Sequence, residues 1–565
     1  MLRRIGSANG NLIGYRRRVM LAGVLAVMAS STLALSAQNV TVAGVVKDPS
    51  GQPVAGAFIK IRSAESGLSF MVISQAQGRF STPKLLPGKY TVQGFGGGQQ
   101  SSPVGPVQVT DGAPVKLELV LSKPQKVYPP PKKMTDQDYI ALMPEGDGKK
   151  LLLTRCVICH SPGNYVARRK SREDWRETVD KMRYYLSQNP ERLKEYNAKT
   201  GLGVGPVSDQ EKDTIADYLA KNFGQDKPPL VDSPSDPNQH LPRTLLKGAE
   251  GKYFAMELDL GRSTLVGSYA LDSRGTVWIS EKKSGILGRL DPKSFAYTRV
   301  FTPPVKAPHF VDPFATVAID PQGMIWFTSN VVPNAQWFQY DPASNKIANT
   351  YDVPLPEVPG GDIFFNTLRF HPNGTVWATD TAYHRIVKLD PSTHKVTEYP
   401  VRYGQHPFGI AIGGDKMVWF AGDEDNLIVK VDPDTGQRTN YKLPPLDSRP
   451  RRMTTDADGN LWVNTLSHGK LVKVDYRTGK MTDYSPPTDG PGQGIDIDRK
   501  RNLIWFSEYD AVKIGRLDPR TNTFVEFPVT SSDSQPWNIE IDPTNPNRVW
   551  WNSRNGRIGY IEVTE

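Results

Sequence analysis

Short runs in which apolar and polar residues alternate dominate the chain and predict a protein built mainly from β-strands. Near the N-terminus such runs cover Val40–Lys47, Ala57–Arg62 and Tyr90–Gln93, with Asp48–Pro53 and Pro87-Gly88 as turns between them. Short strands separated by turns of this kind are typical of a small β-sandwich. We predict a sandwich over residues 38–123.

A different periodicity follows, in which apolar residues recur at helical spacing between residues 134 and 225. One helical pattern begins near Gly148 and a second covers Arg172–Leu186, with Ser171 as its expected N-cap. A third begins at Ser208-Asp-Gln-Glu211, which is a capping box. Linkers rich in proline flank this region at residues 124–133 and 226–250. The sequence therefore predicts a small all-α domain between two β domains.

The remainder of the chain, residues 251–565, repeats a pattern of four short strands in which one strand carries a tryptophan. The spacing between successive tryptophans is 42 to 51 residues. A period of this length with four strands indicates one propeller blade per repeat. We therefore predict a seven-bladed β-propeller. The seven tryptophans are Trp278, Trp326, Trp377, Trp419, Trp462, Trp505 and Trp550.

The last repeat ends before a fourth strand, while Tyr253–Leu258 precedes the first complete repeat and has the character of a strand. Pairing this segment with the last repeat would close the ring and cover its open edges. We predict that pairing.

Residues in both β regions resemble known families. Gly44–Ala57, Gly78-Arg-Phe80 and Leu86–Tyr90 resemble the carboxypeptidase regulatory-like domain, which implies a transthyretin-like sandwich with an accessory role. Gly374–Asp380, Gly459–Thr465, Leu503–Glu508 and Ile514–Pro519 resemble the virginiamycin B lyase (streptogramin lyase) family. That resemblance implies a Mg²⁺-assisted elimination that opens a cyclic depsipeptide ester, using Glu and His near the funnel. This chain reads Glu508-Tyr-Asp510 where the lyase family has Glu-x-His, so the activity does not carry over directly.

The N-terminal segment changes how the net charge is interpreted. The formal charge is +10, but Arg3, Arg4, Arg16, Arg17 and Arg18 precede an apolar run that ends in Leu35-Ser36-Ala37. This order is that of a secretory signal peptide at residues 1–37, with a retained membrane anchor as the disfavoured alternative. The processed chain carries about +5. We expect a periplasmic or secreted protein that does not bind nucleic acid.

The helical region contains Cys156-Val-Ile-Cys159-His160, the attachment pattern for haem c. Its two thiols attach covalently to the porphyrin and His160 ligates the iron. A zinc site is the alternative, but structural zinc takes about four ligands and the chain has only two cysteines. Met182 is the favoured candidate for the second axial position, and a plain core position is the competing interpretation. Trp175-x6-Met182 and Ile215–Leu219 resemble cytochrome domains attached to bacterial quinohaemoprotein-type enzymes.

Several charged residues are expected near the propeller axis, where they could hold a divalent metal such as Mg²⁺ or an anionic ligand. Solvated loop positions are the competing interpretation of each. The Arg449-Pro-Arg-Arg452 cluster is the most unusual, because three cations near an axis favour carboxylate or phosphate. The candidates are Glu281, Asp380, Glu508, His309, His406, Arg449, Arg451 and Arg452.

Three functions follow from these patterns. The first is electron transfer by a haem c domain, with a redox partner protein or a small-molecule electron donor, while the propeller binds a small ligand or partner. The second is a metal-dependent lyase acting in the propeller funnel. The third is a non-catalytic binding or sensing module.

Overall fold

The structure is a computed structural model of the 565-residue chain. It describes residues 41–564 apart from 111–113, 128–134, 159–161, 167, 188–189, 229–235, 262–263, 282–284, 302–313, 330–334, 355–364, 382, 402–405, 424, 445–447, 468, 489 and 554. The predicted signal peptide lies outside the described residues. No helix in the described part of the chain is long and apolar enough to cross a membrane.

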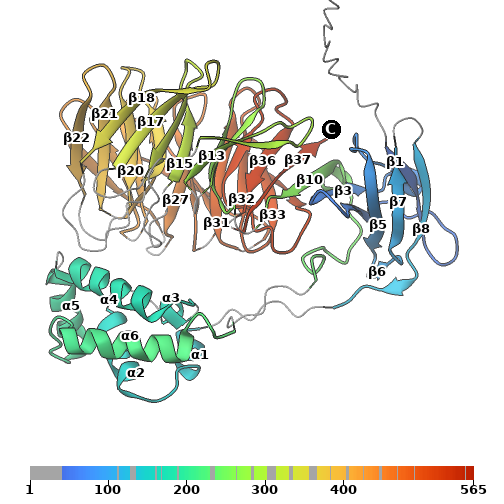
Figure 1. Cartoon of the computed structure of the whole chain (residues 1–565). Helices are drawn as coiled ribbons and strands as arrows, with labels where there is room; N and C mark the ends of the chain where they lie inside the picture. The colour runs from blue at the N-terminus through green and yellow to red at the C-terminus, as the bar shows by residue number, and fades with distance from the viewer. Residues whose placement is uncertain are drawn as a thin grey trace, which may run out of the picture. The chain divides into compact units, whose positions relative to one another are not determined.

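The N-terminal region is a two-sheet sandwich, coloured blue in Figure 1. One sheet has the order β4-β1-β8, in which β1 and β8 run parallel, and the other contains β3-β2-β5-β6-β9, with β7 paired to β5. The predicted strands near residues 40, 57 and 90 are present as β1, β2 and β5. The bounds are β1 (Val42–Lys47), β2 (Phe58–Ser63), β3 (Leu68–Ile73), β4 (Arg79–Ser81), β5 (Gly88–Gly96), β6 (Gln99–Gln100), β7 (Val104–Val109), β8 (Val115–Val120) and β9 (Lys123–Pro124).

The helical domain is described here by itself. Three of its helices match the sequence expectation: the segment before the cysteine motif, the helix after Ser171, and the helix after Ser208. The Ser208–Glu211 capping box forms as predicted, with reciprocal hydrogen bonds of 3.2 and 2.7 Å. The bounds are α1 (Asp136–Ala141), α2 (Asp147–Leu151), a π-helical turn (Leu152–Cys156), α3 (Gly163–Val166), α4 (Arg172–Ser187), α5 (Pro190–Thr200) and α6 (Asp209–Phe223).

The C-terminal region contains seven four-stranded antiparallel units in the described part of the chain, which we call blades 1 to 7. Within blades 1 to 6 the four strands pair in chain order, and in blade 7 the fourth strand is β10, which precedes blade 1 in the sequence. The first strands of successive blades lie beside one another, as in a β-propeller. Hydrogen bonds from Leu271 N to Glu540 Oε1 and from Asn552 Nδ2 to Val266 O join blade 7 to blade 1, so the ring is closed.

The blade strands have the following bounds: blade 1, β11 (Val266–Leu271), β12 (Val277–Glu281), β13 (Ile286–Leu290) and β14 (Tyr297–Phe301); blade 2, β15 (Phe314–Ile319), β16 (Ile325–Ser329), β17 (Ala335–Asp341) and β18 (Lys346–Val353); blade 3, β19 (Phe365–Phe370), β20 (Val376–Asp380), β21 (Arg385–Asp390) and β22 (Lys395–Pro400); blade 4, β23 (Pro407–Ile412), β24 (Val418–Gly422), β25 (Leu427–Val431) and β26 (Arg438–Lys442); blade 5, β27 (Pro450–Thr455), β28 (Leu461–Thr465), β29 (Leu471–Val474) and β30 (Met481–Tyr484); blade 6, β31 (Gly492–Asp498), β32 (Leu503–Glu508), β33 (Lys513–Asp518) and β34 (Thr523–Pro528); blade 7, β35 (Ile539–Ile541), β36 (Arg548–Asn552), β37 (Arg557–Val563) and β10 (Tyr253–Asp259).

The repeated tryptophans pack between blades and are all at most 2% exposed. Most of their indole N–H groups donate to a side chain of the turn that precedes the strand, as Trp326 does to Asp320 at 2.7 Å and Trp462 to Asp456 at 3.0 Å. This bond satisfies a buried donor that would otherwise cost stability. The tryptophans are therefore packing residues, as the repeat indicates.

Strand β10 has partners on both edges (Figure 1). It pairs with β37 from Tyr253↔Val563 to Asp259↔Arg557, which confirms the predicted closure of the last blade. Its other edge pairs with β3 of the sandwich, from Phe254↔Val72 to Leu258↔Leu68. Blade 7 and one sheet of the sandwich thus form one continuous sheet, which the sequence pattern did not predict.

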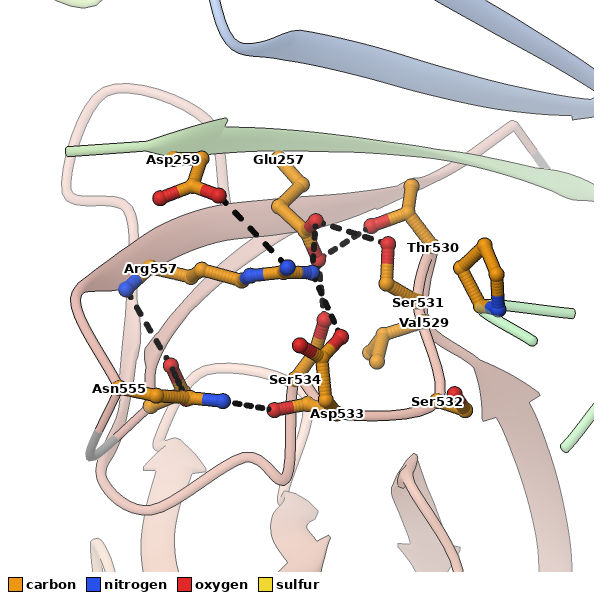
Figure 2. A network of polar contacts seen from close by, with 12 residues as sticks. Glu257, Asp259, Val529, Thr530, Ser531, Ser532, Asp533, Ser534, Asn555 and Arg557 are labelled. Atoms are coloured by element: carbon orange, nitrogen blue, oxygen red, sulfur yellow. Dashed lines mark hydrogen bonds and ion pairs between the residues drawn. The ribbon is translucent and has the colours of Figure 1, made fainter. Parts of the chain in front are cut away.

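A buried carboxylate fixes the junction between β10 and blade 7 (Figure 2). Glu257 is 2% exposed and accepts hydrogen bonds from Thr530 Oγ1 at 2.6 Å, Ser531 Oγ at 2.9 Å and Ser534 Oγ. Arg557 donates to Glu257 at 3.0 Å and pairs with Asp533 at 2.8 Å. Buried charge is tolerated when it is paired and hydrogen-bonded in this way.

Candidate functional site

The helical domain encloses a cavity of about 160 Å³ between α4, α6 and the helical segment that leads into the cysteine motif. Its wall is largely apolar, with Leu152, Val179, Leu186, Ile215 and Leu219 among the lining side chains. The amphipathic spacing of α4 directs Val179 and Leu186 inward, and that of α6 directs Ile215 and Leu219 inward. A mainly apolar wall with a few polar side chains is typical of small-molecule sites.

The half-buried residues Cys156 and Met182 both line this cavity. Cys159 and His160 lie outside the described residues. The Trp175 side chain is 1% exposed and lines the same cavity, and its Nε1 has no hydrogen-bond partner among the described residues. An unpaired buried donor of this kind fits a site that receives a ligand with acceptor atoms.

Arg155, next to the cysteine motif, ties this wall to α6. Its guanidinium forms an ion pair with Glu211 at 2.6 Å and also donates to Gly205 O. Burial raises the pKa of Glu211, but hydrogen bonds from Ser208 and Arg155 outweigh it and hold that pKa below its usual range. The Glu211 carboxylate, at the third position of α6, therefore also links α6 to the segment that leads into the cysteine motif.

Two of the predicted propeller carboxylates are engaged within their own blades. Glu281 is fully buried and accepts from Tyr297 Oη at 2.8 Å and Arg299 Nε at 2.7 Å. Asp380 is fully buried and pairs with Arg385 at 2.9 Å; Arg385 in turn pairs with Glu398 at 2.7 Å. These contacts match a structural role in blades 1 and 3.

Glu508, at the end of β32, is different. It is 2% exposed, and neither carboxyl oxygen receives a hydrogen bond among the described residues. Burial, together with the negative charge of Glu526, raises the pKa of Glu508 to about 8, although Lys513 acts in the opposite direction. Glu526 itself is held by Lys513 at 2.7 Å and Thr488 Oγ1 at 2.6 Å. Glu508 therefore keeps its proton near neutral pH beside an ionised carboxylate.

The predicted arginine cluster is partly neutralised. Asp423 accepts from Arg449 Nε and Nη2, both at 3.0 Å, and pairs with Arg451 at 3.2 Å. Arg451 also stacks over the Phe408 ring at 4.3 Å. The His406 ring stacks on the His384 ring with centroids 4.8 Å apart. His309 lies outside the described residues.

Arg452 points elsewhere, into a cavity of about 470 Å³ lined by the first strands of six blades. The charged residues on this wall are Arg369, Arg452, Asp496, Arg499 and Glu540, of which the sequence pattern had singled out only Arg452. The other charged residues could have been found from the sequence by looking for a charged residue in the first strand of a blade, where apolar residues are usual. No group of three or more His, Cys, Asp or Glu side chains with metal-site geometry occurs among the described residues.

Comparison with known families finds two matches. The model of the virginiamycin B lyase family matches residues 334–565, and that of the carboxypeptidase regulatory-like domain matches residues 41–122. Both family resemblances expected from the sequence are thereby found. The helical domain lies outside the matched residues. No curated protein matches the chain.

Solved structures similar to this chain include lyases of that family. A virginiamycin B lyase from Staphylococcus aureus is 24% identical, with 55% of this chain and 100% of that chain covered and a TM-score of 0.48. A streptogramin B lyase is also 24% identical, with 56% and 100% covered and a TM-score of 0.49. A chain of the mitotic checkpoint complex is 10% identical, with 60% and 95% covered and a TM-score of 0.45.

Proposed function

We propose that this protein is a periplasmic c-type cytochrome in which a seven-bladed propeller binds a small molecule or a redox partner. The observation that carries the proposal is the apolar cavity of the helical domain, whose wall includes both Cys156 and Met182. The Cys-x-x-Cys-His sequence begins at that same cysteine. The apolar run after Arg16–Arg18 supports export across the cytoplasmic membrane. Haem c is attached outside that membrane, so export agrees with the proposal.

The residues present fit a covalent haem. Cys156 and Cys159 would attach it, His160 would ligate the iron, and Met182 is positioned on the cavity wall as the other candidate ligand. The buried Trp175 indole offers an unused N–H donor to an acceptor on the group. When bound, haem supplies one-electron redox chemistry. The chain's own contribution is to exclude water with an apolar wall and to hold the ligating atoms in place.

Covalent attachment is tested by expressing the exported chain with a haem-attachment system and staining for haem after denaturing electrophoresis. We expect a stained band with a reducible haem spectrum, and loss of the stain in Cys156→Ala. Absence of covalent haem in the wild-type chain would refute the proposal.

The role of Met182 is tested by replacing it with leucine, which keeps apolar volume but removes the thioether. Thioether ligation raises the haem potential, so Met182→Leu should lower the midpoint potential and open the iron to added imidazole. Val179→Leu alters the same helix and cavity wall without touching a donor and serves as the control. An unchanged potential in Met182→Leu would exclude this ligand.

Electron transfer is tested by recording reduced-minus-oxidised spectra while small-molecule donors and candidate redox proteins are added. Reduction of the haem by a donor that binds to the propeller would support both parts of the proposal, electron transfer by the haem and ligand binding by the propeller.

A lyase is the second candidate, and it is favoured by the state of Glu508. A buried carboxyl with a pKa of about 8 and no donor on either oxygen can accept or release a proton near neutral pH. The match of residues 334–565 to the virginiamycin B lyase family supports this alternative. Opening of a cyclic depsipeptide ester by the wild-type chain, lost in Glu508→Gln, would establish it.

A further inference from the structure

The cavity at the propeller centre carries charges that its own residues leave unmatched. Arg452, on β27 of blade 5, donates from Nη1 to Asn366 O at 2.8 Å and Thr367 Oγ1 at 2.5 Å on blade 3. Its side chain therefore crosses between non-adjacent blades. Its Nε has no partner among the described residues.

The two carboxylates on the same wall accept hydrogen bonds from backbone N–H groups and form no ion pair with the arginines among the described residues. Asp496 accepts from the backbone N–H groups of Ile497 at 2.8 Å and Ile541 at 2.9 Å. Glu540 accepts from Leu271 N at 3.1 Å. In the described part of the chain, neither carboxylate forms an ion pair with Arg369, Arg452 or Arg499. A guanidinium has five N–H donors. Among the described residues, Arg369 donates only from Nη1 to Leu368 O, and Arg452 donates only from Nη1.

The charge balance of the wall is positive. Burial raises the pKa of Glu540 to about 8, with a further upward effect from Asp496 and Asp542, against the downward effects of the Leu271 N–H and Arg369. Glu540 is therefore mostly neutral at pH 7, which leaves three arginines against Asp496. Burial and the nearby Arg369 lower the pKa of Arg452 to about 9, so Arg452 remains charged at that pH. Arg369 and Arg452 are half-buried, whereas Arg499 is exposed. Partly desolvated cations with no ion-pair partner among the described residues are costly, and a bound anion would offset that cost.

The wall also offers neutral polar contacts. Asn538 lines the cavity, and both its Nδ2 and Oδ1 are buried without a partner among the described residues. The volume of about 470 Å³ exceeds what a few waters need and lies within the range of small-ligand sites. Guanidinium groups bind carboxylate and phosphate-like oxygens in a bidentate fashion.

We propose that the central cavity of the propeller binds a small oxyanion carrying two negative charges, held by Arg369 and Arg452 with Asn538 as a further contact. This proposal specifies the class of ligand that the propeller binds, and it rests on the proposed function only in that the propeller is a binding domain. It does not depend on the haem.

The test is calorimetric titration of the full-length holoprotein at pH 7 with sulfate, and separately with succinate, against chloride at matched ionic strength. Sulfate stands for compact tetrahedral anions and succinate for dicarboxylates. We expect saturable binding of at least one, weakened tenfold or more in Arg452→Gln. Arg438→Gln, an exposed arginine on the outer strand β26, is the matched control and should bind as the wild type does.

A second variant keeps the proposal falsifiable if Arg452→Gln does not fold. Glu540→Gln removes a carboxylate that becomes charged above pH 8, so it should bind the anion at least threefold more tightly than the wild type at pH 8.5 and equally at pH 6.5. No saturable binding of either anion, or equal binding by the Arg452 variant, would overturn the site. Calorimetry does not use haem absorption. Failure of the anion-site proposal is therefore distinguishable from failure of the cytochrome assignment.

Discussion

At the scale of single residues, buried carboxylates in this protein serve two different purposes. Glu257 and Asp380 are surrounded by donors and pair with arginines, so their charge holds strands together. Glu508 has no donor on either oxygen, and its burial favours the protonated form. Asp380 and Glu508 both carry a carboxyl group and both end the second strand of a blade. Only the neighbouring side chains make one carboxyl ionised and paired and the other protonated.

The Glu508 carboxyl should make stability depend on pH. Its pKa is raised from 4.5 to about 8 in the folded state, so between these values the folded chain retains a proton that the unfolded chain has lost. The contribution is complete below about pH 4.5 and is lost as pH rises through about 8. Each pKa unit corresponds to about 1.4 kcal/mol. Glu508→Gln should flatten the unfolding free energy over this range in denaturant titrations, whereas exposed Glu65→Gln should not. An unchanged slope would contradict the assigned burial.

At the scale of elements, helix α6 shows how a local signal is realised. Its capping box was readable from four residues, because the Ser208 and Glu211 side chains satisfy backbone N–H groups within the first turn. By contrast, α5 (Pro190–Thr200) was not predicted, because its sequence is short and mostly charged or polar, with few apolar residues to mark a buried face. The π-helical turn Leu152–Cys156 was equally unmarked in sequence.

Removal of the α6 cap should destabilise the helical domain. Ser208→Ala deletes the oxygen that accepts from Glu211 N, which costs about 1 kcal/mol for a typical N-cap. Thr214→Ala removes a hydroxyl from the middle of the same helix and should be close to neutral. Chemical unfolding followed by far-ultraviolet circular dichroism measures both, and an equal effect of the two variants would argue against the cap.

At the scale of the whole molecule, the sandwich and the propeller share one sheet and two hydrophobic cores. Phe70 of β3 packs in one cluster with Leu258 and Trp550, and Met71 packs in another with Phe527 and Trp551. The outer edge of the last blade, which would otherwise expose unpaired backbone groups, is covered by β3. The sandwich is therefore a structural part of the propeller.

A core change in the sandwich should consequently weaken the propeller. Met71→Ala creates a cavity in the shared cluster and should lower the unfolding free energy by about 2–5 kcal/mol. Tryptophan fluorescence, which reports mainly on the blades, should shift to lower denaturant concentration. Ile215→Ala, in the separate core of the helical domain, should leave that propeller transition in place. A sandwich variant that spares the propeller would show that the two unfold independently.

The sequence by itself determined the features that depend on local pattern. The tryptophan repeat predicted the blades, and the segment Tyr253–Leu258 was predicted as the closing strand, because strand periodicity and turn residues act over a few positions. The spacing of Cys156, Cys159 and His160 is likewise a local pattern, from which we propose haem attachment. Only the tertiary structure decided that β3 pairs with β10, since backbone hydrogen bonds at a sheet edge leave no residue signature. It also decided that Arg369, Arg452, Asp496 and Glu540 meet in one cavity, because closure of the ring brings together residues up to 171 positions apart.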